Sequence, residues 1–261
     1  MSDMTSSIAS EWTKLWSVRS TWWCLVGAVF LVAFYAVPAG FDAAQPNPDL
    51  SYAQQLLHVE DVVFTALQFS QFALVALALL TVTSEYASGS IRTTLQCDPR
   101  RGRVLVAKLV VVEVVALVGG ALLAVLGAVL ADLTAGEYGV FDAGEVAAAA
   151  GRVSVYLAVV VAFSIGLAVA LRSTAGALVG AFLVLFLVPL VFMMSGVDLM
   201  VDMSFWLPGT AGTEYLGIGI ATLFGLDDQL PYGEGGALVL FAAWAGVVLA
   251  AGYAAFRSRD A

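Results

Sequence analysis

Six long apolar runs divide this chain, and they restrict its possible folds more than any other feature. About 20 apolar residues in a helix cross the roughly 30 Å hydrocarbon core of a bilayer. Backbone polar groups find no water there, and a helix satisfies them within one segment. We therefore expect an all-α membrane protein with six transmembrane helices at residues 22–40, 62–83, 104–131, 153–170, 175–195 and 236–256.

The composition favours a membrane protein over a soluble one. Of 261 residues, 61% are hydrophobic and only 12% are charged, whereas soluble domains carry about 25% charged residues. The mean hydropathy is +0.94. Because the six runs leave little chain for a soluble domain, residues 1–261 are expected to form a single integral membrane domain.

The charged residues alternate in sign along the connecting segments. Segments 41–61, 132–151 and 196–235 contain no lysine or arginine but hold fourteen of the twenty acids, which fits either solvation or a cation-attracting vestibule. Ten of the eleven bases, all but Arg152, lie in the termini and the two other connections. Because connections rich in lysine and arginine stay in the cytoplasm, we expect a multi-pass protein of the cell (plasma) membrane with both termini cytoplasmic and 196–235 extracellular.

The connection between the second and third runs concentrates positive charge. The stretch 84–108 holds five of the eleven bases, namely Arg92, Arg100, Arg101, Arg103 and Lys108. A basic, helix-prone connection of this kind predicts a cytoplasmic loop over residues 84–103.

Residues 1–21 carry large apolar side chains at helical spacing. In a single helix, one face would contain Ile8, Trp12, Leu15, Trp16, Trp22 and Trp23. An aromatic stripe beside basic residues favours a helix lying in the cytoplasmic membrane interface. The alternative is a simple aromatic belt that holds the first span in place.

The second run is the most polar of the six. Its outer half holds Thr65, Gln68, Ser70 and Gln71. Gln68 lies one turn from Thr65 and from Phe72, so these three can share one face of a helix. Amides exposed to lipid are unfavourable. These side chains therefore either form hydrogen bonds between helices or line a substrate path.

Three further features lie in the third span, the fifth span and the segment after it. Glu113 is a carboxylate within the third run, where an acid is either a functional group or a shallow interfacial partner. Pro189 predicts a kink or an end in the fifth helix. In 196–235, we expect short membrane-surface helices at 205–208 and 216–224, which are too short to span.

The sequence lacks the motifs of common catalytic sites. It contains no GxxxxGK[ST] phosphate loop and no HExxH zinc motif. Its one histidine, His58, is expected to be a solvated loop residue, while Cys24 and Cys97 fit reduced, incidental thiols. We expect no catalytic site, no cofactor or metal bound to this chain and no nucleic-acid partner.

Four short segments carry a further signal when they are taken together. They are SEWTKL at 10–15 with VRSTWW at 18–23, EYASGSIR at 85–92 with Ala107-Lys108, LRSTAGA at 171–177, and LPGTAG at 207–212. In this order they resemble the permease subunit of type-2 ABC exporters, a six-span family, across nearly the whole chain. Glu113 and the strongly acidic outer segments depart from the family pattern.

The resemblance implies a coupling element that docks on separate ABC ATPase subunits. It places this element at about 85–96, with Glu85, Tyr86, Gly89, Ile91 and Arg92 as the coupling residues. Glu85 would link the loop to the spans, pairing with a nearby base. ATP and magnesium would bind the partner ATPase.

The resemblance further implies a second permease copy or a homologous permease. The substrate path would follow the second and fifth spans, which gives Gln68, Gln71 and Phe72 a role in it. The few polar groups in the spans favour export of a hydrophobic or amphipathic substrate. Two other functions stay open, an ion-coupled secondary carrier and a non-transporting membrane anchor or regulatory protein.

Overall fold

The computed structural model describes residues 4–45 and 51–258, and this part of the chain is almost entirely helical. The expected all-α membrane fold with six spans is confirmed. The six helices that are long and apolar enough to cross a membrane are α2 (Arg19–Ala43), α4 (Val59–Ser88), α6 (Arg101–Ala135), α7 (Ala143–Leu171), a fifth helix interrupted by a π-helical turn (Thr174–Met194) and α13 (Glu234–Ser258).

The helices extend beyond the apolar runs that predicted them. α4 continues through the polar residues after Thr83 and ends before Gly89, whose φ of 72° is left-handed. Glycine adopts this conformation without a side-chain clash and commonly ends helices. α6 begins three residues before the expected Val104. The loop expected at 84–103 is therefore mostly helical.

The fifth span consists of three pieces, α8 (Thr174–Phe182), the π-helical turn η2 (Leu183–Leu187) and α9 (Val188–Met194). Pro189 has no N–H to donate to the carbonyl group of Leu185. A widened turn lies directly before the proline, as such insertions commonly do where the helical ladder is interrupted. The helix does not end at Pro189, since α9 continues to Met194, and the expected kink stays a prediction.

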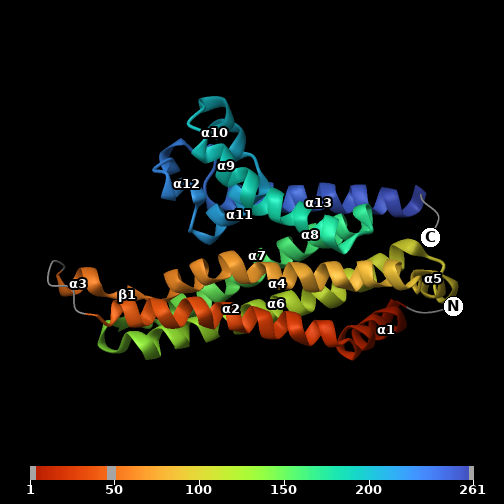
Figure 1. Ribbon diagram of the computed structural model, residues 1–261, viewed down its shortest axis with the longest axis horizontal. Helices are drawn as coiled ribbons and strands as arrows, with labels where there is room; N and C mark the ends of the chain where they lie inside the picture. Colours follow the sequence, from red (N-terminus) through yellow and green to blue (C-terminus); the bar gives the residue numbers. More distant parts are fainter. Residues whose placement is uncertain (1–3, 46–50, 259–261) are drawn as a thin grey trace.

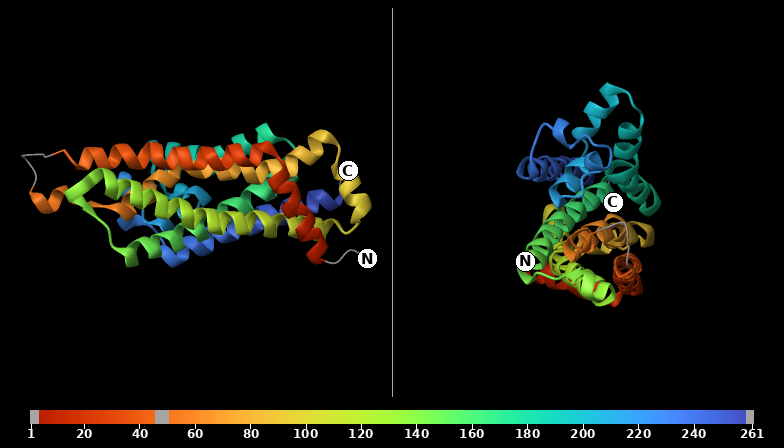
Figure 2. Two further views of the ribbon diagram at one scale, coloured as in Figure 1. Left: turned by 90° about the horizontal axis from the view of Figure 1, so that it is seen from below. Right: turned by 90° about the vertical axis from the view of Figure 1, so that its left-hand side faces the viewer.

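The spans form an elongated bundle in which α7 packs against α4, α6 and α13 (Figure 1). One end carries both termini, α1 (Met4–Ser17) and α5 (Ile91–Cys97), and we call it the α5 end. The opposite end carries α3 (Tyr52–Gln55) and β1 (Leu57–His58), which pairs with β2 (Gly139–Val140) after the turn η1 (Gly136–Tyr138). Figure 2 shows α1 crossing the α5 end obliquely to the spans.

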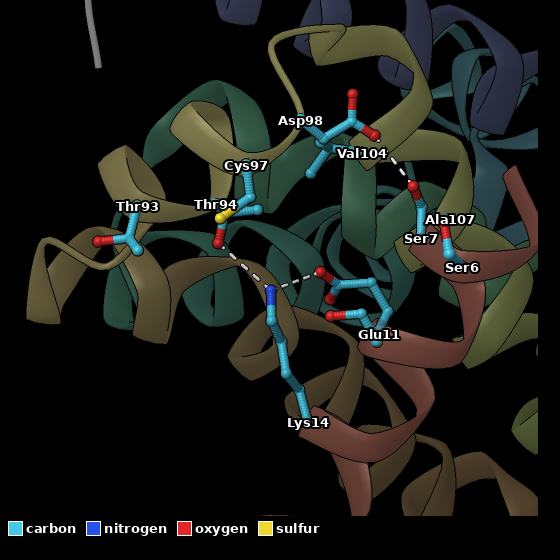
Figure 3. Close-up of a pocket in the computed structure, with 11 residues that line it drawn as sticks. Ser6, Ser7, Glu11, Lys14, Thr93, Thr94, Cys97, Asp98, Val104 and Ala107 are labelled. Carbon is cyan, nitrogen blue, oxygen red and sulfur yellow. Dashed lines mark hydrogen bonds and ion pairs between the residues drawn. The ribbon is translucent and has the colours of Figure 1, made fainter. Parts of the chain in front are cut away.

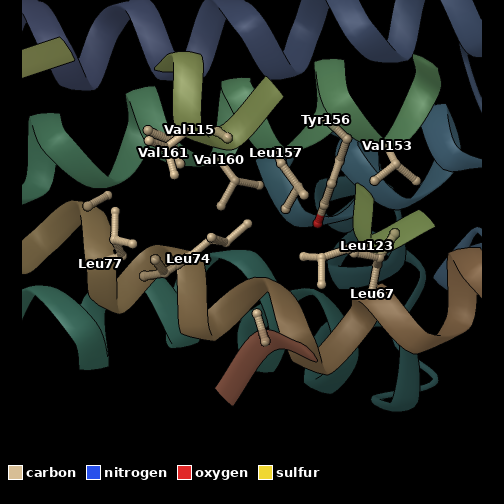
Figure 4. Packing of buried hydrophobic residues seen from close by; sticks show 14 of the residues in the cluster. Leu67, Leu74, Leu77, Val115, Leu123, Val153, Tyr156, Leu157, Val160 and Val161 are labelled. Atoms are coloured by element: carbon tan, nitrogen blue, oxygen red, sulfur yellow. The ribbon is translucent and has the colours of Figure 1, made fainter. Parts of the chain in front are cut away.

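The core lies between α4, α6 and α7, where branched aliphatic side chains interdigitate (Figure 4). The backbones of α7 and α13 approach each other closely. A Cβ atom added to Gly252 on α13 would lie 2.5 Å from the carbonyl oxygen of Gly166 on α7. Small residues of this kind permit close helix packing in membranes.

The residues of the expected interfacial stripe are divided between two helices. α1 ends at Ser17, because Val18 is extended (φ −97°, ψ 130°), so Trp22 and Trp23 belong to α2. The buried residues of α1 are Glu11 and Leu15 rather than the tryptophans. The first three residues of the expected 1–21 segment lie outside the described residues.

The segment 196–235 contains the helices α10 (Asp198–Phe205), α11 (Pro208–Leu216) and α12 (Ile220–Leu223) and the turn η3 (Asp227–Gln229). The helices expected at 205–208 and 216–224 are wrong in their bounds. Pro208 starts a helix because its fixed φ suits the first turn. Gly217, with a φ of 82°, ends it.

Helix α11 is buried inside the protein rather than resting on its surface. Its residues 208–213 and Leu216 are all buried. A Cβ atom added to Gly209 would lie 2.1 Å from the carbonyl oxygen of Leu185 in η2. α11 therefore folds back against the interrupted fifth span and α13.

Candidate functional site

The α5 helix is a short element between two spans. After Gly89 reverses the chain, α5 runs for seven residues and ends before Asp98. Ile91 is buried, whereas Arg92 and Thr93 are exposed. α5 thus has one side that holds it to the bundle and another that faces outward.

Four charged side chains meet beneath α5. The Nζ of Lys108 on α6 lies 2.7 Å from Oε2 of Glu11 on α1 and 2.8 Å from Oε1 of Glu85 on α4. The Nζ of Lys14 on α1 lies 2.6 Å from Oε1 of Glu11 and 3.0 Å from Oε1 of Glu85. We call Glu11, Lys14, Glu85 and Lys108 the charge cluster. Its two acids and two bases balance.

The charge cluster joins four elements; Glu11, Glu85 and Lys108 are shielded from solvent, whereas Lys14 is 41% exposed. The Lys108 side chain is only 4% exposed, and its ammonium also donates to the carbonyl oxygen of Thr81 at 3.2 Å. Lys14 donates to Oγ1 of Thr94 on α5 at 3.3 Å. Burial by itself would lower the pKa of Lys14, but hydrogen bonds to Glu11 and Glu85 outweigh it and raise that pKa above 10.5. Lys14 is therefore charged at neutral pH.

A second group of polar contacts fixes the end of α5. Asp98 accepts bonds from Arg103, with Nε 2.6 Å from Oδ2 and Nη2 2.5 Å from Oδ1. The hydroxyl of Ser7 on α1 donates to Oδ2 of Asp98 at 2.9 Å. The Ser7 hydroxyl thus ties α1 to the α5–α6 connection.

The pH dependence of stability should reveal the Asp98 contact. Hydrogen bonding from Arg103, opposed by burial, lowers the pKa of Asp98 from 3.8 to about 2. The unfolded chain therefore takes up the proton first, so this stabilisation is complete above pH 3.8 and disappears as pH falls towards 2. Between these values, we expect the unfolding temperature of Asp98→Asn to fall less than that of the wild type. Glu137→Gln, which changes an exposed acid at the other end, should behave like the wild type; an identical fall in all three proteins would contradict the prediction.

The tight hairpin between α7 and α8 and the end of α13 also reach this region. The guanidinium of Arg172 lies 4.9 Å from the ring centroid of Tyr86. Thr174 and Thr83 are joined by a 2.6 Å hydrogen bond. Arg101 donates to the carbonyl oxygen of Phe256 at 2.5 Å. Segments far apart in the sequence therefore converge on the α5 end.

Two cavities flank the charge cluster. One of about 240 Å³ lies between α1, α5 and α6 and contains Lys14, Thr94 and Asp98 among its lining residues (Figure 3). The other, of about 530 Å³, lies between α1, α4 and α6. Figure 3 shows the Lys14 ammonium pointing between Glu11 and Thr94.

The structure divides the predicted coupling residues into two groups. Glu85 and Ile91 are buried and Tyr86 is half-buried, whereas Gly89 and Arg92 are exposed. The base expected to pair with Glu85 is present twice, as Lys14 and Lys108. Glu11 was not predicted; its spacing of three residues from Lys14 and the lysine in an apolar run were the available signals.

The three residues predicted to line the substrate path lie in different surroundings. Gln71 is only 1% exposed, and its Oε1 accepts a 2.6 Å hydrogen bond from Tyr156 on α7, so it joins two helices. Phe72 packs against Phe182 in the fifth span with tilted rings, whose centroids are 5.4 Å apart. Gln68 is partly exposed beside it.

The opposite end holds one cluster that spacing along the chain did not indicate. His58, Glu60 and Glu145 each place a possible metal-ligand atom within 4.8 Å of the others. His58 is 53% exposed, as expected for a solvated residue, and its Nδ1 lies 3.3 Å from Oε1 of Glu60. Glu113 lies half-buried on α6, well away from this end.

Comparison with known proteins identifies no family for this chain. No protein-family model and no curated protein matches this chain. The function must therefore be argued from the α5 end itself.

Proposed function

We propose that this chain is the transmembrane subunit of an ATP-driven ABC exporter and is powered by separate ATPase subunits that dock on α5. One observation carries the proposal: α5 exposes one face while the buried charge cluster ties it to α1, α4 and α6. Three of the four segments that resemble the type-2 exporter family converge at this end, namely 10–23, 85–92 with Ala107-Lys108, and 171–177. In this function, ATP and magnesium bind the partner, and this chain has no catalytic site.

The geometry suggests how movement of an ATPase reaches the spans. A displacement of α5 acts on Thr94 and, through Lys14, on Glu85 at the end of α4. Lys108 passes the same displacement to α6. Buried ion pairs resist separation, because losing one partner leaves an uncompensated charge. The cluster would therefore transmit motion rather than absorb it.

The proposal places the α5 end in the cytoplasm and the chain in the cell membrane. Most bases lie at or near this end, in agreement with the positive-inside tendency. Both termini would be cytoplasmic, and the acidic segments would face outward.

We place the substrate path along the aromatic face between α4 and the fifth span. Phe69 packs on Phe186, and Phe72 packs on Phe182. Phe69 is 54% exposed, so this face is open to a lipid, a substrate or a second permease copy. Gln68 gives this face a polar group, which suits a hydrophobic or amphipathic substrate.

The docking proposal predicts a charge-reversal effect on α5. An ATPase with a phosphate loop, encoded beside this chain, should co-purify with the wild type. Arg92→Glu places a negative charge on the exposed face, and we expect about tenfold less ATPase to be recovered. Arg19→Glu, an exposed base at the start of α2, makes the same charge change outside α5 and should keep the complex.

Energy supply separates this proposal from the alternatives. ATP depletion should stop transport, whereas collapse of the proton gradient should not. Transport that depends only on the gradient would contradict an ATP-driven permease and support an ion-coupled carrier. A complex that forms equally well with Arg92→Glu would contradict docking on α5.

A further inference from the structure

The larger of the two cavities beside the charge cluster changes from apolar to polar along its length. Its volume is about 530 Å³. Leu80 on α4 and Val111 and Val112 on α6 supply apolar side chains to its lining. Ser84 and Ser88, one and two turns after Leu80, and Thr93 on α5 supply hydroxyl groups beside the charge cluster. This combination suits an amphiphile with a polar head and a hydrocarbon chain.

The two lysines of the charge cluster have no donor left for an anionic ligand. A lysine ammonium has three donors and no acceptor. Lys14 uses its three on Glu11, Glu85 and Thr94. Lys108 uses its three on Glu11, Glu85 and the carbonyl oxygen of Thr81. A phosphate would therefore have to break existing ion pairs.

The carboxylates of the charge cluster retain unused acceptor capacity. Each carboxylate oxygen has two lone-pair sites. Oε1 of Glu85 accepts from both lysines, but Oε2 is reached by a 3.5 Å contact from Thr94. Glu85 also lines the cavity. The site therefore favours a headgroup that donates hydrogen bonds and, since the cluster is neutral, carries no net charge.

We propose that this cavity binds phosphatidylethanolamine from the surrounding membrane. Its primary ammonium would donate to Glu85, its phosphate would accept from the hydroxyl of Thr93, and an acyl chain would cover Leu80 and Val111. The cavity lies where the apolar parts of α4 and α6 give way to polar residues, which is the depth of lipid headgroups. This binding is independent of coupling to an ATPase.

The test compares lipids on the purified, delipidated chain by native mass spectrometry. We expect phosphatidylethanolamine to bind about tenfold more tightly than phosphatidylcholine, whose trimethylated ammonium cannot donate a hydrogen bond. Phosphatidylglycerol, an anion, should also bind more weakly. Leu80→Trp, which fills the cavity, should abolish the preference.

Two further variants control the test. Ser84→Phe blocks the cavity from an exposed position and should abolish the preference without affecting the buried core. Val118→Trp adds the same bulk as Leu80→Trp at a 57% exposed position on α6 outside the cavity, and should keep it. Equal binding of the three lipids, or a preference that survives both blocking variants, would overturn the proposal. So would soluble ethanolamine that raises the unfolding temperature as much as the lipid does.

Discussion

Lys108→Met should destabilise this protein by about 3–5 kcal/mol, because it leaves Glu11 and Glu85 with one ammonium between them in a buried site. The methionine fills a similar volume, so the loss reflects charge rather than a cavity. For a chain of this size, we expect the unfolding temperature in detergent to fall by roughly 10 °C. Since Lys108 holds α1 and α4 to α6, α1 should also become accessible to protease.

Two further variants test whether lost charge balance causes the destabilisation expected for Lys108→Met. Glu11→Gln combined with Lys108→Met leaves one acid and one base, and should recover more than half of the loss. Arg152→Met breaks an ion pair with Glu234 at the other end, where the side chains are 39% and 60% exposed. Exposed pairs contribute about 0–1 kcal/mol. If Lys108→Met unfolds at the same temperature as Arg152→Met, the cluster does not hold the α5 end together.

Gly209→Ala should have the second large effect, because α11 has no room for a side chain where it meets the fifth span. The new Cβ atom would lie 2.1 Å from the carbonyl oxygen and 2.6 Å from the carbonyl carbon of Leu185. These are backbone atoms that cannot rotate away. Overpacking of this kind costs about 1–3 kcal/mol or more, so we expect a lower unfolding temperature and loss of transport.

The matched control is Gly151→Ala on α7, where an added Cβ atom meets nothing within 4 Å. Alanine is favoured over glycine within a helix, so this variant should be as stable as the wild type or more stable. If both variants behave alike, α11 is not packed against η2 as described.

The spans could be predicted because hydrophobic length depends on local sequence alone. Their ends could not, because they depend on partners distant in the chain. α4 continues through Glu85 since Lys14 and Lys108 neutralise that carboxylate, and these partners lie on α1 and α6. An apolar run ends where a charge appears, whereas a helix ends where its backbone turns, here at Gly89.

The candidate site was predicted only in part, because its contacts also join residues that are distant in the chain. The basic stretch predicted a cytoplasmic loop, and the resemblance to type-2 exporters implied a coupling element there in which Glu85 pairs with a nearby base. Sequence spacing did not show that Glu11 and Lys108, 97 positions apart, would share an ion pair. The sequence allowed Gln71 either a hydrogen bond between helices or a place on a substrate path, but it did not identify Tyr156 of α7 as the partner. Both contacts depend on how the helices pack against one another, which the spacing of residues along the chain does not show.

The central claim, that an ATPase docks on α5, can be tested at one native side chain. Cys97 is exposed at the end of α5, and the other cysteine, Cys24, can be replaced by alanine. A photo-crosslinker on Cys97 should join this chain to the ATPase in membranes. In a Cys24→Ala and Cys97→Ala background, a crosslinker on Ser195→Cys, exposed beyond the other end of the fifth span, should not. An adduct from Cys97 alone is the predicted result; an adduct from Ser195→Cys alone, or from neither position in an otherwise intact complex, would contradict docking on α5.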